Sequence, residues 1–218
     1  MAENSTKHER EQNLQDSSAS LFPMFLKLKS RPCLVVGAGR IAESKIPGLL
    51  DAGAEVRVVA PEANEAVTEW ARAGKISWDA RRFDPADLDG VVLVIAATST
   101  ADVNETVFRE AHRCNVLCNA VDDPENCDFY YPAVVRRGAL QIAISTGGRS
   151  PALAQRLRQE LEEQFGPEYA EWVDQLGAAR AELFSREIEP ETRRQKLHEI
   201  ASCRAFAVHS ANPGAKRS

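Results

Sequence analysis

The hydrophobic positions of the chain fall into short apolar runs that alternate with amphipathic stretches over residues 32–119. Such runs are typical of buried strands, and they predict strands at residues 32–37, 55–60, 76–80, 91–96 and 115–119. The stretches between them predict helices at residues 40–52, 63–73 and 101–113. Pro47 should weaken the first of these helices. Strands that alternate with helices indicate βαβ units, so the sequence predicts an α/β fold with a Rossmann-type, doubly wound parallel sheet.

The pattern changes after residue 123. Two apolar runs at residues 131–136 and 139–145 predict neighbouring strands, compatible with a hairpin. Ser150 is the expected N-cap, and Pro151 the first residue, of a helix that reaches about residue 164. Two closing helices are expected at residues 168–185 and 191–207. Residues 1–20 have no hydrophobic period, so we expect them to form a solvated arm.

Composition narrows the class of protein. The chain has 218 residues, 44% hydrophobic and 27% charged, which is unlike disordered, collagenous or disulfide-rich proteins. No apolar run is long enough to span a membrane, and the polar start lacks the apolar core of a signal peptide. Five cysteines without tight pairing fit a reducing compartment. We therefore expect a cytoplasmic protein with a small-molecule ligand, and the net charge of −5 makes nucleic acid an unfavourable partner.

Residues 37–42 read GAGRIA, which fits the GxGxxA pattern of dinucleotide-binding turns between a strand and a helix. Gly37 would allow the tight turn, and Gly39 would let the backbone approach a pyrophosphate at the helix N-terminus. The alternative is a tight turn that binds nothing. Glu62 follows the second strand, where an acidic residue would bind a ribose, although a helix-start carboxylate is an equal alternative. Because no arginine follows Glu62 closely, the pattern favours NAD over NADP.

Asp122 follows the fifth predicted strand, at the edge where open α/β sheets bind ligands. A carboxylate there could act as a general base beside a hydride acceptor. From spacing alone, a turn-forming aspartate ahead of Asp123 is the favoured alternative. Cys114, Cys118 and Cys127 do not have the spacing of a zinc site, so we expect free thiols and no metal site.

Charge is distributed unevenly along the chain. Residues 129–159 hold no Asp or Glu but five arginines, namely Arg136, Arg137, Arg149, Arg156 and Arg158. Arginine suits bidentate binding of carboxylate or phosphate, so this stretch indicates a polyanionic ligand. The alternative is a solvated face whose arginines pair with acidic residues such as Glu160, Glu162 and Glu163.

Several of these segments occur together in the order and spacing of one known family. They read LFPMFL at residues 21–26, VGAGRIAESK at 36–45, VAPE at 59–62, AAT at 96–98, CNAVD at 118–122 and STGGRSP at 145–151. With them the chain resembles the precorrin-2 dehydrogenase family of siroheme biosynthesis, which includes stand-alone enzymes and the amino-terminal module of fused siroheme synthases. The resemblance extends from residue 21 to at least residue 161. One departure is Ala38, where the family commonly has the middle of three glycines.

The resemblance implies an NAD-binding domain at residues 21–130, a dimerisation region at 131–165, a helical domain at 166–218, and a homodimer. It implies NAD-dependent dehydrogenation of precorrin-2 to sirohydrochlorin, and Fe²⁺ insertion as a further activity. The family's essential aspartate falls on Asp122. Cofactor contacts are expected at Gly37, Gly39, Arg40, Ile41, Pro61, Glu62 and Thr98. Contacts to the polycarboxylate tetrapyrrole are expected at Asn119, Arg136, Arg137, Thr146 and Arg149.

Two other functions stay open at this point. One is a chelatase for Fe²⁺ or Co²⁺ with secondary dehydrogenase activity, since one carboxylate could serve both reactions. The other is an NAD-sensing module without chemistry, which would need neither the arginine stretch nor a particular aspartate. With 218 residues we expect no fused methyltransferase module, so that a separate enzyme would supply precorrin-2.

Overall fold

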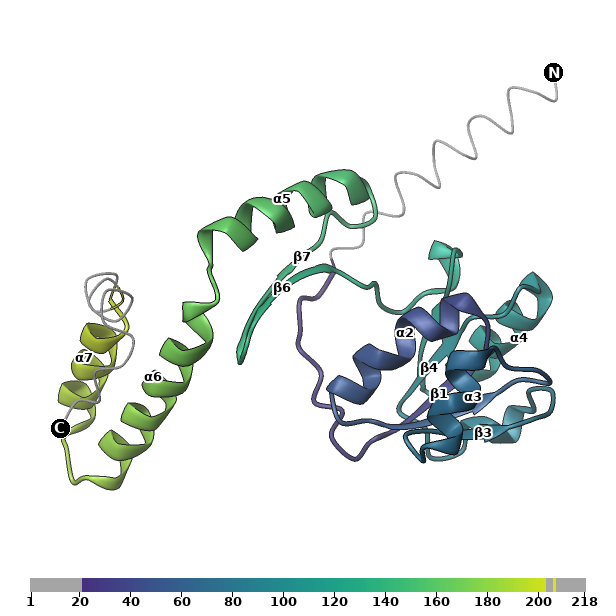
Figure 1. The fold of residues 1–218 in the computed structure, drawn as a ribbon, viewed down its shortest axis with the longest axis horizontal. Helices are drawn as coiled ribbons and strands as arrows, with labels where there is room; N and C mark the ends of the chain where they lie inside the picture. Colours follow the sequence, from purple (N-terminus) through teal and green to yellow (C-terminus); the bar gives the residue numbers. More distant parts are fainter. Residues whose placement is uncertain (1–20, 203–205, 207–218) are drawn as a thin grey trace, which may run out of the picture. The chain divides into compact units, whose positions relative to one another are not determined.

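The computed structural model describes residues 21–202 and residue 206, and the chain divides into two compact units, one up to Tyr131 and one from Pro132 (Figure 1). The first unit is built on a five-stranded parallel sheet. Its elements are β1 (Pro32–Val36), α2 (Arg40–Asp51), β2 (Glu55–Val59), α3 (Glu65–Arg72), β3 (Ser77–Asp79), η1 (Pro85–Leu88), β4 (Leu93–Ala96), α4 (Ala101–Arg113), β5 (Leu117–Ala120) and η2 (Pro124–Asn126).

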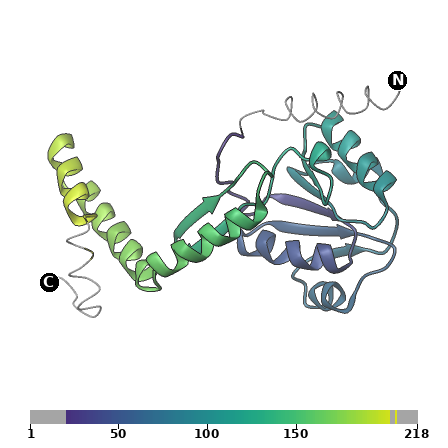
Figure 2. The same cartoon turned by 90° about the horizontal axis from the view of Figure 1, so that it is seen from above.

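The strands lie in the order β3-β2-β1-β4-β5, and every neighbouring pair is parallel. The chain first moves outward from β1 to β3 and then returns to the other side of β1 with β4. This reversal between β1 and β4 is the switch point at which open α/β sheets bind ligands. Helices cover both faces of the sheet, with α2 on one face and α4 on the other (Figure 2).

Side chains alternate between the two faces of the sheet. Val35 packs with Ile46 of α2 on one face, and Leu34 packs with Val107 and Ala111 of α4 on the other. All five are fully buried. Burial of a Val, Leu or Ile side chain is worth roughly 1.5–3 kcal/mol, so these two layers hold the strands in register.

The second unit begins with an antiparallel hairpin of β6 (Ala133–Arg137) and β7 (Leu140–Ile144). Three helices follow, α5 (Pro151–Gln164), α6 (Glu168–Ser185) and α7 (Pro190–Ile200). Ser150 caps α5 by accepting a hydrogen bond from the Leu153 amide at 3.3 Å, and Pro151 is the first helical residue, as expected. No helix in the described part of the chain has the length and hydropathy of a membrane span.

The predicted fold class is confirmed, and the structure differs from the sequence prediction at several element ends and in the effect of Pro47. The fifth strand begins at Leu117 rather than at residue 115, because Asn115 takes a positive φ of 55° in the turn after α4. Helix α2 runs through Pro47, which lies on its exposed side where water can solvate the carbonyl that lacks a donor. Helix α7 ends at Ile200 and not at residue 207, and most of the residues beyond 202, like the expected arm at 1–20, lie outside the described residues.

Candidate functional site

The loops that leave the carboxyl ends of the parallel strands carry most of the predicted site residues. The GAG turn follows β1, Pro61 and Glu62 follow β2, Thr98 follows β4, and Asp122 follows β5. Hydrogen bonds join these loops: the amide of Asn64 donates to the carbonyl of Ala38 at 3.0 Å. The amide of Val121 donates to the carbonyl of Ala96 at 3.0 Å. The structure therefore brings the glycine turn and Asp122 to one edge of the sheet.

The two glycines of the turn have different environments. Gly37 has a φ of +104°, and a Cβ placed on it would lie 2.5 Å from the carbonyl oxygen of Ala97. Gly39 has an ordinary φ of −91°, and a Cβ placed on it would meet nothing within 4 Å. The fold therefore requires glycine at position 37, whereas position 39 borders open space that a bound group can fill.

The N-terminus of α2 faces this open space. Its N-cap is Gly39, so no side chain caps the first turn, and the amides there are available to an anion. Arg40 is exposed and its guanidinium has no partner among the described residues. The one carboxylate in the first turn, Glu43, accepts a hydrogen bond from the side chain of Asn64 at 2.7 Å. These features fit a dinucleotide whose pyrophosphate lies over Gly39.

Glu62 is exposed in the turn after β2, where it can reach a ribose. The alternative role as a helix-start carboxylate is wrong, because α3 begins at Glu65 and is capped by the side chain of Asn64. The guanidinium groups of Arg57 and Arg81 contact Asp87 Oδ1 at 2.8 and 2.6 Å. The hydrogen bond from Arg81 lowers the pKa of Asp87 to about 2. These two arginines are thus engaged within the protein rather than free for a 2′-phosphate.

The Thr98 loop is held by a buried amide. The hydroxyl of Thr98 donates to Asn104 Oδ1 at 2.7 Å, and its amide donates to the same oxygen at 3.1 Å. The Asn104 side chain donates in return to the carbonyl of Thr98 at 3.1 Å. Asn104 is 7% exposed and lies with Val107 and Ala111 on the buried side of α4. These contacts fix the loop beside the glycine turn.

Asp122 is exposed and has a φ of +62°, in the left-handed region that residues other than glycine rarely adopt. It is the third residue of a turn closed by the Asp123 amide, which donates to the carbonyl of Ala120 at 3.2 Å. Asn119 is 7% exposed, and its side-chain amide donates to the carbonyl of Phe129 at 2.8 Å. The expected turn is therefore present, and it presents the carboxylate at the sheet edge.

The arginine stretch divides into engaged and free side chains. Arg156 and Arg158 pair with Glu160 and Glu162 within α5, at 3.4 and 2.5 Å, as the alternative interpretation expected. Arg137 donates to the carbonyl of Phe165 at 2.7 Å at the end of the same helix.

Arg136 and Arg149 are exposed, and their guanidinium groups have no partner among the described residues. Thr146 is half-buried, and its hydroxyl accepts from the Ser150 amide at 3.0 Å. Arg136, Arg137, Thr146 and Arg149 belong to the second unit, whereas the glycine turn and Asp122 belong to the first.

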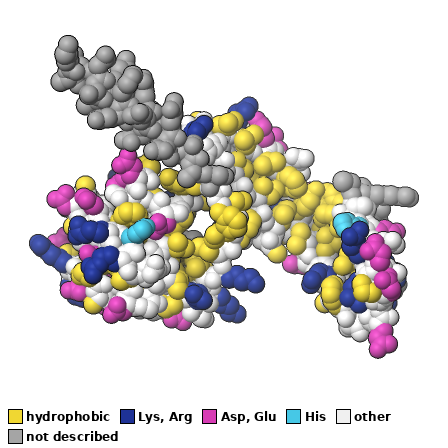
Figure 3. All heavy atoms as spheres, turned by 180° about the vertical axis from the view of Figure 1, so that it is seen from behind, with side chains coloured by type: hydrophobic (Ala, Val, Ile, Leu, Met, Phe, Trp, Pro, Cys, Tyr) yellow, Lys and Arg dark blue, Asp and Glu magenta, His cyan; other side chains and the backbone are white. Residues whose placement is uncertain are grey.

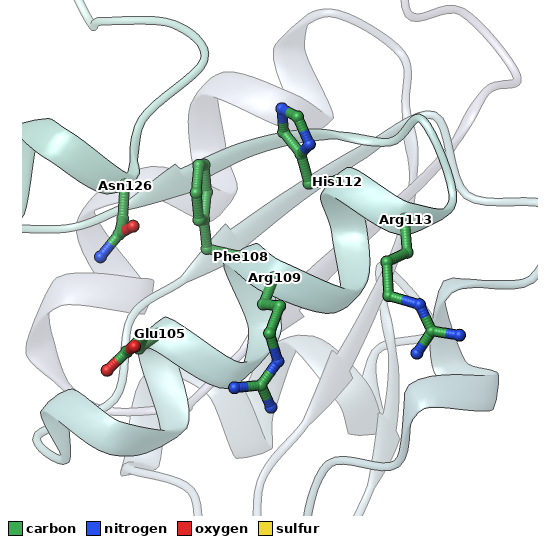
Figure 4. A pocket seen from close by; sticks show the side chains of 6 residues that line it. All are labelled: Glu105, Phe108, Arg109, His112, Arg113 and Asn126. Atoms are coloured by element: carbon green, nitrogen blue, oxygen red, sulfur yellow. The ribbon is translucent and has the colours of Figure 1, made fainter.

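A hollow of about 430 Å³ lies on α4 and on η2, the short helix that follows the Asp122 turn. It is lined by Glu105, Phe108, Arg109, His112, Arg113 and Asn126 (Figure 4). Arg113 pairs with Glu110 at 2.7 Å, and the rings of Phe108 and His112 lie 5.7 Å apart. None of the predicted site residues lines this hollow.

The described cysteines are free thiols, and no cluster of His, Cys, Asp or Glu in the described ranges could hold a metal ion. Burial raises the pKa of Cys33 to about 11 and that of Cys118 to about 12, so both thiols stay protonated. Sequence reasoning missed Asn64 and Asn104, which hold two of the ligand-edge loops. The available signal for Asn104 was a polar residue on the apolar side of a predicted helix.

Comparisons with known proteins identify the family and the fold that the chain shares. The family described as putative NAD(P)-binding matches residues 24–133, and the one described as sirohaem biosynthesis protein central matches residues 137–164. A siroheme synthase of Methylobacillus flagellatus is 49% identical over 140 residues, covering 64% of this chain and 30% of that protein. Siroheme synthase 1 of Aeromonas salmonicida is 39% identical over 180 residues, covering 83% of this chain and 38% of that protein. The chain thus spans about a third of the length of these relatives.

Among solved structures, SirC, described as a precorrin-2 dehydrogenase, superposes with a TM-score of 0.72 and 29% identity, covering 84% of this chain and 90% of that one. The family resemblance predicted from the sequence is confirmed.

Proposed function

The chain belongs to the putative NAD(P)-binding family and resembles siroheme synthases, and from that premise we propose that it oxidises precorrin-2 to sirohydrochlorin with NAD⁺. The observation that carries the proposal is the placement of Asp122 and the open glycine turn at one edge of the sheet. A nucleotide-binding module without chemistry would need the turn but would not need a strained carboxylate beside it.

The cofactor would lie across the switch point between β1 and β4. The amides after Gly39 and the guanidinium of Arg40 would hold the pyrophosphate, with Ile41 in the same helix turn. Pro61 and Glu62 would contact the adenosine ribose, and the Thr98 loop would border the nicotinamide side. Bound NAD⁺ supplies the hydride acceptor. NAD rather than NADP is supported by the engagement of the nearby guanidinium groups with Asp87.

Asp122 would act as the general base of this reaction. As the substrate loses a hydride, one carbon-bound or nitrogen-bound proton must also leave, and the Asp122 carboxylate would accept it. The products are then sirohydrochlorin, NADH and one proton. The chain's own contribution is to hold the carboxylate at the sheet edge and the cofactor on the neighbouring turn, so that both act on one bound ring.

The substrate is a polycarboxylate, and the free guanidinium groups of Arg136 and Arg149 would bind its acid groups. Arg137, Thr146 and Asn119 are proposed as further substrate contacts through their remaining hydrogen-bonding capacity. The competing carboxylates of α5 already pair with Arg156 and Arg158, which leaves Arg136 and Arg149 as the stronger candidates.

We also propose a homodimer. In the described part of the chain, β6 and β7 pair only with each other, so the outer edge of each strand is free to pair with a strand of a second copy. Large apolar side chains are uncovered on the first unit as well, with Phe22 79% and Phe25 67% exposed. Figure 3 shows hydrophobic side chains at the surface of both units. Light scattering at several concentrations tests this, and a monomer at all of them would contradict it.

The experiment for the main proposal is an anaerobic assay with precorrin-2 and NAD⁺, following NADH and sirohydrochlorin together. Asp122→Asn should lower turnover by roughly 10²–10⁴-fold and leave NAD affinity nearly unchanged. Asparagine also tolerates a positive φ, so the turn should persist. The matched control is Asp123→Asn, which should keep most of the activity. In the native chain the Asp123 carboxylate accepts a hydrogen bond from the Asn126 side chain at 2.6 Å. Near-normal turnover of Asp122→Asn would contradict the proposal.

The same reaction with Fe²⁺ or Co²⁺ measures metal insertion. In that reaction Asp122 would accept the pyrrole protons that the metal replaces. Metal uptake after NADH formation would make the protein bifunctional, whereas metal uptake without NADH would favour the chelatase alternative. NAD binding with neither reaction would favour the sensing module.

A further inference from the structure

The thiol of Cys127 lies across the turn that carries Asp122. We propose that Cys127 is a positioning residue, which holds the Asp122 turn in the conformation that presents the carboxylate. This inference deepens the proposed function, in which Asp122 is the base. It concerns the backbone of the turn, so that part of it can be tested without any substrate.

The geometry of the thiol is specific to this turn. Cys127 Sγ lies 3.1 Å from the carbonyl oxygen of Ala120 and 3.1 Å from that of Asp123. These are the first and last residues of the turn, so the contacts bracket Asp122 on both sides. A thiol has one proton, which the two carbonyls share. The sulfur in turn accepts a hydrogen bond from the buried side-chain amide of Asn119 at 3.3 Å.

The two contacts of the Cys127 thiol matter because the backbone of the turn is strained at Asp122. Asp122 has a φ of +62°, a region that costs free energy for any residue with a Cβ and persists only where surrounding contacts enforce it. Without the thiol, the carbonyls of Ala120 and Asp123 lose a common donor, and the turn can relax toward a negative φ. Such a change would redirect the Asp122 side chain, because the Cβ direction depends on φ.

The protonated thiol is the form that can donate. Burial raises the pKa of Cys127, and the neighbouring carboxylates of Asp123 and Asp128 act in the same direction. The thiol is therefore a donor at neutral pH rather than a nucleophile. The side-chain amide of Asn119 bonds both the Cys127 sulfur and the carbonyl of Phe129, and these bonds hold the sulfur in place.

The test compares Cys127→Ala, Cys127→Ser and the matched control Cys118→Ala in the full chain. Cys118 is fully buried in β5, the strand that leads into the turn, but its thiol does not bond the carbonyls of Ala120 and Asp123, so its truncation removes packing without removing their donor. Cys127→Ala should lower kcat by roughly tenfold with little change in the Kd of NAD, and Cys127→Ser should recover part of the loss. Cys118→Ala should lower the melting temperature but keep kcat within about twofold.

Hydrogen exchange gives a readout that needs no turnover. The Asp123 amide donates to Ala120 within the turn, so its exchange should accelerate in Cys127→Ala and not in Cys118→Ala. Unchanged exchange in Cys127→Ala would overturn the inference whatever the activity. If exchange is accelerated in Cys127→Ala but the native protein does not oxidise precorrin-2, the positioning role of Cys127 stands and the proposed function is wrong.

A double variant shows whether Cys127 acts through Asp122. If it does, adding Cys127→Ala to Asp122→Asn should lower turnover by less than twofold, far less than the same change in the native chain. Equal and independent losses in the two backgrounds would refute a positioning role. Equal loss of kcat in Cys127→Ala and Cys118→Ala would likewise assign the effect to general destabilisation.

Discussion

Replacing Gly37 or Gly39 by alanine should have different effects. At Gly37 the substitution should lower the stability of the fold, and at Gly39 it should weaken ligand binding. At Gly37 the added Cβ would lie 2.5 Å from the Ala97 carbonyl oxygen, in a backbone conformation with a φ of +104°. At Gly39 the added Cβ would meet nothing within 4 Å. The pair of variants, Gly37→Ala and Gly39→Ala, therefore separates a structural glycine from one that a ligand requires.

The magnitudes follow from these environments. For Gly37→Ala, the positive φ costs roughly 1–2 kcal/mol and the overpacked contact roughly 1–3 kcal/mol. A total of about 3 kcal/mol would lower the melting temperature of a chain of this size by about 6–12 °C. Gly39→Ala changes stability by about 0.5 kcal/mol or less, because the gain from a stiffer unfolded chain offsets the poorer N-cap.

The assays are thermal melting without ligand and titration with NAD⁺. Gly39→Ala should melt close to the native protein but bind NAD⁺ at least about tenfold more weakly, since the methyl group occupies space that the pyrophosphate needs. Gly37→Ala should show the large melting shift. Undiminished NAD⁺ affinity in Gly39→Ala would refute the placement of the pyrophosphate, and a melting shift under about 2 °C in Gly37→Ala would refute the steric reasoning.

Three further predictions concern charge, packing and strain. Asp87→Asn should lower the free energy of unfolding by at least about 2 kcal/mol at pH 7, because the folded pKa of Asp87 lies below its ordinary value. Urea unfolding at several pH values checks this. The difference between the two proteins should persist above about pH 4 and vanish as the pH falls through about 2. Gly138→Ala should destabilise the second unit by about 2 kcal/mol, because Gly138 has a φ of +56° and the new Cβ would lie 3.0 Å from that of Ala170, and a melting curve checks this. Asp122→Ala should be about 1 kcal/mol less stable than Asp122→Asn in denaturant, because asparagine adopts a positive φ more readily.

The sheet and its order of elements could be predicted because burial on both faces leaves a strong apolar signal. Apolar runs such as residues 91–96 are typical of strands buried on both faces, and their alternation with helices indicates a parallel sheet. Boundaries were less predictable where a single residue decides the backbone. Asn115, with its φ of 55°, delays β5. Asparagine adopts this conformation more readily than most residues, but spacing alone does not show which residue ends the turn.

The positions of the loops at the sheet edge could be predicted from the sequence, but the hydrogen bonds that hold these loops could not. Motif positions placed Gly37, Gly39 and Asp122 at strand ends, which is enough to put them at one edge of a parallel sheet. The amides that hold these loops come from other elements. Asn64 bonds Ala38 of the turn after β1 through its backbone amide and Glu43 of α2 through its side chain, and Asn104 bonds Thr98 from inside α4. These are tertiary contacts that spacing along the chain does not encode.

The two sequence interpretations of Asp122, turn former and general base, are compatible, and the turn explains how the base could work. In a regular strand or helix the side chain of residue 122 would point toward one face of the sheet, where α2 or α4 packs. The left-handed conformation instead ends the strand abruptly and leaves the carboxylate exposed at the edge, next to the loop after β4. If residue 122 served only to form the turn, glycine or asparagine would adopt its positive φ at a lower cost in free energy than aspartate. A carboxylate in that conformation, beside carbonyls that the Cys127 thiol contacts, fits the proposed role of a base next to a bound cofactor.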